Sequence, residues 1–492
     1  MLFKKKTILP SSYPKDFKEM DLTHIYFNAP DPSFQRENVI SLSGIASLLV
    51  NESDYIPADF SQAKTVFLPY PIGSLLSESE RLRKKKNVYH YHKLFDVHEG
   101  FLKELTTLTV MKSDGSYQIF INGKFCGSDT DSLRAEYDIS KYIHPGANVL
   151  DITLFEDVKR DVIGISGPIF IDSTAKNRVS KVDISYSIKD EWLKFRIHSK
   201  DPKGIVKIST PNVKEYKAEI VDGVSEFVLS DTVLWTIDNP FFYLYTISLD
   251  SGECVRGMFA LFDLKLGIKD EIRCLTLNDK PMPIKGIIDD YYYSASYTIP
   301  PRTEFVKLML SEIKYVGFNA IRKTSFIDIP DYYHYTLQKG LFIAQDIYFN
   351  TGSELERKID YLNRFESVFL LIIHLPKSAN LKELFTYIKT NLTNKLVILK
   401  YKSHEYGDLG LKEGFMGLDK PKEEVTPFIA SLKFEGGYDE LKEFIKERYI
   451  PSFMSGMVGY FYSSLNNPKD GIYKDNLAGF KGKKKDFIEI IK

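Results

Sequence analysis

Charged and polar side chains follow several short apolar runs in the second half of this sequence. Asp289 and Asp290 come after one run, Arg322 after the next and Asp346 after a third, while His374 closes the longest apolar run of the chain. If these runs are parallel strands, the side chains that follow them meet at one edge of the sheet. The spacing therefore predicts a polar rim that could bind a ligand, or a structural ion pair between Arg322 and Asp346.

The elements that would carry this rim alternate between strand and helix from about residue 275 onward. Helical spacing over residues 304–315 precedes an apolar strand at 318–321, and a helix over 330–339, closed by Gly340, precedes a strand at 341–344. The alternation continues through residues 363–373, 381–390, 396–399 and 441–448. It predicts a largely parallel sheet with crossover helices, in a segment shorter than the roughly 250 residues of a typical eight-stranded barrel.

The first half of the chain has sequence patterns that are typical of β-strands. Short apolar runs with turn signals, including Asn122-Gly123 between two such runs, predict antiparallel strands before residue 175. Strict alternation over residues 182–188 is typical of strands in a second, smaller sandwich. The predicted fold class is multidomain β plus α/β: a jelly-roll-like β-sandwich (1–175), an immunoglobulin-like β-sandwich (176–268) and a shortened TIM-type (β/α)8 barrel (269–492).

Composition excludes several classes of function. The chain of 492 residues fits about three domains, and its 66 basic and 66 acidic residues leave no net charge to attract nucleic acid or an anionic membrane surface. Three cysteines without a CxxC pair favour neither disulfides nor structural zinc. We expect a cytoplasmic protein without a signal peptide or membrane span, because the apolar runs are too short for either.

Other chemical motifs are weak. His90 and His92 alternate along an expected strand, but no third metal ligand accompanies them, so we expect no metal site. Phosphate-binding loops, dinucleotide fingerprints and serine nucleophile elbows do not occur, so we expect no cofactor. The tyrosines at 291–293 could stack on a ligand ring, although packing is their default role.

Several strings, in their order along the chain, resemble glycoside hydrolase family 2, the family of β-galactosidases, β-glucuronidases and β-mannosidases. In the first domain the resemblance lies in Ile-Asn-Gly-Lys-Phe-Cys-Gly-Ser at 121–128, and in the second in Leu-Trp-Thr-Ile-Asp-Asn-Pro at 234–240. At the barrel entry it lies in Leu-Asn-Asp-Lys-Pro at 277–281 and Val-Gly-Phe-Asn-Ala-Ile-Arg at 316–322. The resemblance implies the three-domain order given above and a site for β-linked glycosides in the barrel mouth.

The family's catalytic positions are altered in this sequence. A retaining glycosidase needs two carboxylates, one as nucleophile and one as acid/base. The family's Asn-Glu pair falls on Leu375 and Pro376, neither of which can donate a proton. Aligned on Ser431, the family's nucleophile falls on Leu432. Aligned on the following Gly-Gly pair, it falls on Phe434, one residue before Glu435, which could reach the site only through a strand bulge.

Two hypotheses remain open. In the first, the chain is a homologue without the usual acid/base that binds a glycan or acts as an accessory subunit. In the second, it is an active β-glycosidase with Glu435 as a weak candidate nucleophile, Asp346 or His374 as acid, and Glu405 as a further carboxylate to consider. In both, Asp289, Asp290, Arg322, Asp346 and His374 could hydrogen-bond sugar hydroxyls. The resemblance also implies a homo-oligomer, because many family members associate through their sandwich domains.

Overall fold

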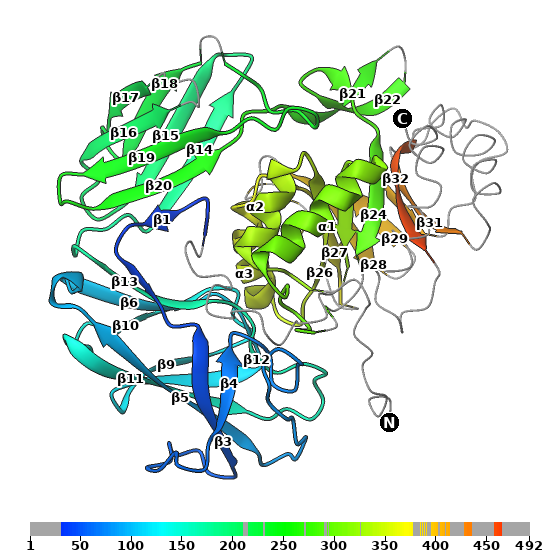
Figure 1. Cartoon of the computed structure of the whole chain (residues 1–492). Helices are drawn as coiled ribbons and strands as arrows, with labels where there is room; N and C mark the ends of the chain where they lie inside the picture. The colour runs from blue at the N-terminus through cyan, green and yellow to red at the C-terminus, as the bar shows by residue number, and fades with distance from the viewer. Residues whose placement is uncertain are drawn as a thin grey trace.

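The structure is a computed structural model of the 492-residue chain. It describes residues 31–209, 215–229, 232–269, 272–289, 293, 295–324, 326–376, 384, 386, 388, 390, 395–401, 404–408, 410–413, 428–434 and 457–464. Figure 1 shows a mostly β chain, in which two groups of antiparallel strands lie beside a curled parallel sheet and its helices.

The first group of strands has two main sheets facing one core. The six-stranded sheet has the order β4 (Lys64–Leu68), β3 (Gly44–Asn51), β5 (Val88–Val97), β11 (Gly146–Phe155), β8 (Ser116–Ile121) and β9 (Lys124–Thr130). The four-stranded sheet has the order β10 (Ala135–Asp138), β6 (Leu105–Val110), β13 (Ile169–Thr174) and β2 (Val39–Ser41). Short elements complete this part: η2 (Glu99–Phe101) and the paired β7 (Ser113–Asp114) and β12 (Gly164–Ile165). Leu108, Tyr117 and Ile152 are buried in its core.

The turn predicted between β8 and β9 is confirmed. Asn122 has a φ of 50° and Gly123 a φ of 72°, so both residues occupy the left-handed region that a type I′ turn requires. Asn122 fits there because its short side chain accepts the Val149 N–H at 2.8 Å.

The second group of strands also forms two sheets around one core. Five strands have the order β1 (Gln35–Arg36), β20 (Cys254–Phe259), β19 (Tyr243–Leu249), β16 (Gly204–Ser209) and β17 (Glu215–Glu219). Three have the order β14 (Lys181–Ser187), β15 (Trp192–His198) and β18 (Val224–Val228). Phe195, Tyr245 and Phe259 pack edge to face or tilted in the core, so the alternation seen in the sequence does reflect strands with one buried face.

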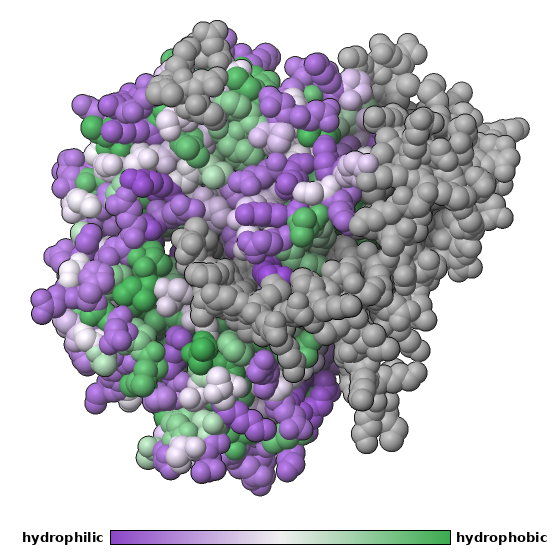
Figure 2. Space-filling model, in the orientation of Figure 1, coloured by the Kyte–Doolittle hydropathy of each residue, from purple (hydrophilic) through white to green (hydrophobic). Residues whose placement is uncertain are grey.

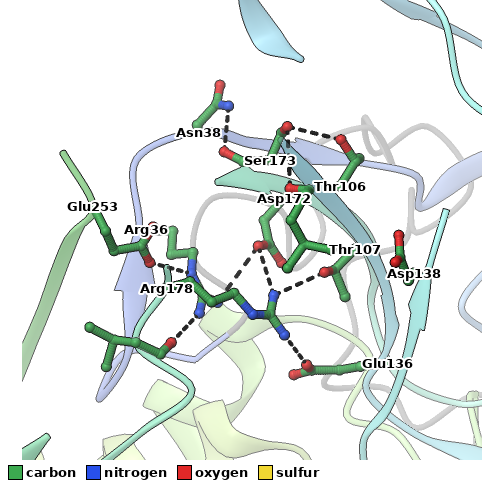
Figure 3. Close-up of polar contacts among 12 residues, drawn as sticks. Arg36, Asn38, Thr106, Thr107, Glu136, Asp138, Asp172, Ser173, Arg178 and Glu253 are labelled. Carbon is green, nitrogen blue, oxygen red and sulfur yellow. Dashed lines mark hydrogen bonds and ion pairs between the residues drawn. The ribbon is translucent and has the colours of Figure 1, made fainter. Parts of the chain in front are cut away.

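Ion pairs join these two groups of strands (Figure 3). Arg36 on β1 lies 3.0 Å from Glu253 before β20 and 3.7 Å from Asp172 on β13. Arg178, between the groups, lies 2.8 Å from Glu136 on β10. Since Asp172 and Glu253 are buried, these pairs are screened little by solvent and hold the two groups in a defined arrangement.

The remaining strands form a curled sheet, preceded by β21 (Leu264–Lys269), β22 (Ile272–Leu277) and β23 (Lys280–Pro281). Its order is β29 (His404–Gly407), β28 (Leu396–Tyr401), β27 (Val368–His374), β26 (Phe342–Tyr348), β25 (Ala320–Lys323), β24 (Ile284–Asp289), β32 (Met457–Ser464), β31 (Phe428–Phe434) and β30 (Gly410–Glu413). The pairs are parallel except β28 with β29. β24 pairs with both β25 and the late strand β32, and the edge strands β29 and β30 lie close to each other, so the sheet curls back on itself.

Three helices connect successive strands from β24 to β27: α1 (Thr303–Val316), α2 (Pro330–Gln338) and α3 (Gly352–Asn363). The sequence predicted the first two but not α3. Its signal is a capping box: Thr351 Oγ1 accepts the Glu354 N–H at 3.2 Å, and the Glu354 carboxylate accepts the Asn350 N–H at 2.9 Å. These helices bury their apolar sides, including Leu310 and Ile359, against the outer face of the curled sheet.

The visible surface of the described residues mixes polar and apolar side chains. Figure 2 shows green patches scattered among purple ones over the two antiparallel groups. Leu94 and Val228 are among the exposed apolar side chains. Scattered exposure of this kind is normal and does not by itself indicate a partner.

Candidate site at the carboxyl end of the curled sheet

Three predicted site residues meet at the carboxyl ends of neighbouring strands. Arg322 lies near the end of β25, Asp346 near the end of β26, and His374 at the end of β27. Because alternate residues of a strand face the same side, all three share the inner face of the curled sheet with buried Ala344 and Ile372. The strand registers therefore bring these three side chains together.

Asp346 is the centre of this cluster, which we call the rim trio. Arg322 donates to it in a fork, with Nε 2.9 Å from Oδ1 and Nη2 2.8 Å from Oδ2. His374 Nε2 lies 2.7 Å from Oδ2. The side chains of Asp346 and Arg322 are 0% and 4% exposed, whereas that of His374 is 20% exposed. The predicted ion pair between Arg322 and Asp346 is thus present, and His374 still meets solvent.

The electrostatics fix the protonation state of Asp346. Burial alone would raise the pKa of its carboxyl group, but the hydrogen bonds from His374 and Arg322 outweigh burial and hold this pKa below its usual range. An ionised carboxylate only accepts hydrogen bonds, so His374 Nε2 is the donor in their contact. Nδ1 is then the ring nitrogen of His374 that can bond elsewhere.

Tyr348 adds an aromatic surface to the rim trio. Its ring stacks on that of His374, with centroids 4.2 Å apart and an interplanar angle of 16°, and the residue is 51% exposed. Tyr348 was not among the residues predicted for the site. Its signal was present, because Tyr348 follows Asp346 by two positions and must share its face of β26.

Asp289 lies elsewhere, although it also ends a parallel strand. It faces the helical side of the sheet, where it accepts hydrogen bonds from Lys323 Nζ at 3.0 Å and the Tyr332 hydroxyl at 3.1 Å. Lys323 also lies 3.2 Å from Asp328 and is fully buried. Alternate residues of a strand face the same side, so Asp289 lies on the face of β24 that carries Ile287 and packs against the helices. Asp289 is therefore separated from the rim trio.

Other predicted candidates give mixed outcomes. Asp290 and Glu435 lie outside the described residues, and Glu405 belongs to β29. Tyr293 is buried and its hydroxyl donates to Asp328 at 2.9 Å, so it packs and does not form an exposed stacking surface, while residues 291 and 292 are not described.

Leu375 and Pro376 directly follow β27, at the positions where the resembling family carries Asn-Glu. The Leu375 N–H donates to Lys400 O at 2.9 Å, which continues the pairing of β27 with β28. Neither side chain can carry a proton. His374 is thus the titratable group nearest to this position in the sequence.

The described part of the chain contains no cluster of three or more His, Cys, Asp or Glu side chains arranged to hold a metal ion. His90 instead contacts Thr153 Oγ1 at 3.2 Å and Ser53 O at 2.9 Å, and burial lowers its pKa. Within the same described ranges, no helix is both long and apolar enough to cross a bilayer.

Comparison with known proteins gives relatives of one kind. No family model matches the chain. A β-galactosidase of Staphylococcus xylosus is 24% identical over 279 residues, which cover 52% of this chain and 27% of that protein. A β-galactosidase of Oenococcus oeni is 24% identical over 302 residues, covering 52% of this chain and 28% of that protein. The chain thus spans only about a quarter of the length of these relatives.

Solved structures share most of the architecture. A β-glucuronidase of Faecalibacterium prausnitzii superposes with a TM-score of 0.73 at 13% identity, covering 93% of this chain and 98% of that one. A β-D-glucuronidase of Dictyoglomus thermophilum gives a TM-score of 0.68 at 14% identity, covering 88% and 90%. A glycosyl hydrolase family 2 member of Bacteroides cellulosilyticus gives 0.66 at 15% identity, covering 90% and 69%.

This chain is glycoside hydrolase family 2-like. The solved structures support this through the fold and the β-galactosidases through sequence. In this family 2-like chain the rim trio lies at the carboxyl end of the parallel strands, which is where enzymes built on such sheets place their sites.

Proposed function

We propose that the chain binds a β-linked carbohydrate at the rim trio and Tyr348, and that it does so without the acid/base carboxylate of its relatives' family. It would then be a glycan-binding or accessory homologue. The observation that carries this proposal is the end of β27, where His374 is bonded to Asp346 and is followed by Leu375 and Pro376.

The arrangement suits binding of a neutral sugar. Tyr348 offers an exposed aromatic face, which packs well against the C–H face of a sugar ring. His374 Nδ1 lies on the same stack and, in the neutral ring whose proton is on Nε2, accepts a hydrogen bond from a hydroxyl. The charge of Arg322 is already balanced by Asp346, so these two groups orient the site without attracting an ionic ligand.

The same proposal includes the architecture behind the site. We assign residues 1–175 to a sugar-binding-like sandwich, 176–268 to an immunoglobulin-like sandwich and 269–492 to a shortened (β/α)8 barrel. The pairing of β24 with β32 supports a barrel. The separate hydrophobic cores of the two antiparallel groups support two sandwiches.

An active β-glycosidase is the second candidate. It requires a carboxylate pair about 5 to 5.5 Å apart, with Glu435 as nucleophile. Asp346 is a poor acid for this role, because its lowered pKa keeps it ionised. His374 would have to act through Nδ1, since its Nε2 proton is directed at Asp346.

Two assays on the purified full-length chain separate these candidates. The first measures hydrolysis of a panel of nitrophenyl β-glycosides by the wild type and by Glu435→Gln, which removes the carboxylate but keeps the shape. The second measures binding of lactose and cellobiose to the wild type and to Tyr348→Ala. We expect no turnover, and binding that Tyr348→Ala weakens. Turnover that disappears in Glu435→Gln would reject the binding-only function in favour of the enzyme.

A further inference from the structure

A large cavity lies where the two antiparallel groups meet the curled sheet, at the opposite end of the sheet from the rim trio. Its volume is about 1180 Å³. Its walls include β14, the segment before β21, and the residues that immediately precede β27 and β28. These last residues lie at the amino ends of the parallel strands, whereas the rim trio lies at their carboxyl ends. The cavity is therefore separate from the candidate site at the rim trio.

The inner wall of the cavity carries polar groups at the amino ends of β27 and β28. Glu366 accepts the Ala260 N–H at 2.9 Å through Oε2. Lys395 Nζ donates to Phe365 O at 2.8 Å and Val368 O at 2.7 Å. The hydroxyl of Ser367 is buried and has no hydrogen-bond partner within the described residues. This wall can therefore donate and accept hydrogen bonds.

Burial suppresses charge on this wall. It raises the pKa of Glu366 to about 7 and lowers that of Lys395 to about 7. It also lowers the pKa of His334, which lines the cavity as well, to about 4, so this imidazole is neutral at pH 7. At pH 7, Glu366 and Lys395 are therefore each only partly ionised.

Two arginines nearer the edge of the cavity have ionic partners of their own. Arg364 pairs with Asp31, and Arg357 lies 3.3 Å from Asp129. A phosphate or carboxylate ligand would have to compete with these carboxylates for the guanidinium groups. Aromatic side chains supply the apolar part of the lining, namely Phe34, Tyr186 and Phe262.

From this geometry we propose that the cavity is a second binding site, for a neutral saccharide. Hydrogen-bonding groups on one wall and aromatic faces on others match the hydroxyl edges and C–H faces of a sugar ring. The volume exceeds the roughly 300–1,000 Å³ of common ligand pockets, so a disaccharide fits. This site does not depend on binding at the rim trio, and either site can exist without the other.

The test is calorimetric titration of the full-length chain with lactose and cellobiose, together with hydrogen–deuterium exchange. Asn363 ends α3, is exposed and lines the cavity, so Asn363→Trp fills the cavity entrance without disturbing a core. Glu356→Trp adds the same ring to an exposed position of the same helix outside the lining. Tyr348→Ala removes the aromatic surface of the rim site.

We expect saccharide to slow exchange at residues 258–262 and 364–368 in the wild type, Glu356→Trp and Tyr348→Ala. In Asn363→Trp we expect at least a tenfold loss of affinity at this site and no such protection. Glucose 6-phosphate should bind at least tenfold more weakly than glucose. The proposal is overturned if saccharide gives no protection in these segments, or if Asn363→Trp binds as tightly as Glu356→Trp. A loss in Tyr348→Ala alone would assign all binding to the rim site.

Discussion

The Nε2 atom of His374 lies 2.7 Å from Oδ2 of Asp346, across the neighbouring strands β26 and β27. The same carboxylate receives the forked hydrogen bonds of Arg322 from β25. One buried acid thus links the ends of three strands. This hydrogen bond uses one ring nitrogen of His374 and leaves the other able to bind a ligand.

Removing Asp346 should destabilise the fold. Asp346→Ala removes the Asp346 carboxylate from the buried Arg322 guanidinium, and we expect a loss of about 3–5 kcal/mol in the free energy of unfolding. Denaturant titration measures it. The control is Asp183→Ala, which removes the partner of Lys181 and His198 in a largely exposed cluster and should cost less than about 1 kcal/mol. Equal losses in the two variants would show that the rim ion pair contributes no more than a surface pair.

Tyr348 should matter for binding and not for folding. Because this tyrosine is half exposed, Tyr348→Ala should leave the melting temperature nearly unchanged. Loss of its stacking surface should weaken lactose or cellobiose binding by up to about tenfold, measured by calorimetry. Tyr315→Ala, at an equally exposed tyrosine on α1, should change neither quantity. A similar loss of affinity in both variants would remove Tyr348 from the site.

The Glu366 and Lys395 pair should give stability a minimum near pH 7. Between pH 4.5 and about 7 the folded state keeps a proton on Glu366 that the unfolded state has lost, so stability falls as pH rises. Between about 7 and 10.5 the unfolded state protonates Lys395 while the folded state does not, so stability rises again. Tyr186 and Tyr245 also face Glu366, but burial raises the pKa of both hydroxyls above this range.

Thermal unfolding of Glu366→Gln across pH 5 to 9 tests this dependence. The fall in stability below pH 7 should become shallower by at most about 1.4 kcal/mol per pH unit, while the rise above pH 7 should persist. A slope should remain, because burial also raises the pKa of Asp331 to about 7. A slope below pH 7 that is the same in Glu366→Gln as in the wild type would contradict the assignment to this carboxyl.

Gly340, in the turn between α2 and β26, should not tolerate a larger residue. Its φ is 69°, and a Cβ there would lie 2.0 Å from the carbonyl oxygen of Ile237. We expect Gly340→Ala to destabilise the chain by at least about 2 kcal/mol. Gly352 has open space around it and no left-handed φ, so Gly352→Ala should be neutral or add up to about 1 kcal/mol. Denaturant titration of the two variants decides, and equal stability would refute the close approach.

Local patterns in the sequence determined much of the fold. Two-residue alternation identified β14, the Asn122-Gly123 pair identified a hairpin turn, and Pro330 with Gly340 delimited α2. These signals act between residues close in sequence, so no tertiary information is needed to interpret them. The same principle would have given α3 from Thr351 and Glu354, and Tyr348 from its parity with Asp346.

Only the tertiary structure decided which polar residues share a site. Asp289 and Asp346 both end parallel strands, yet one faces the helices and the other the interior of the curled sheet. The difference is one residue of register, which reverses the direction of a side chain and which apolar runs buried on both faces do not reveal. The cavity beneath the sheet depended on folding in the same way, since Glu366, Tyr186 and Phe34 come from distant parts of the chain and meet only through packing.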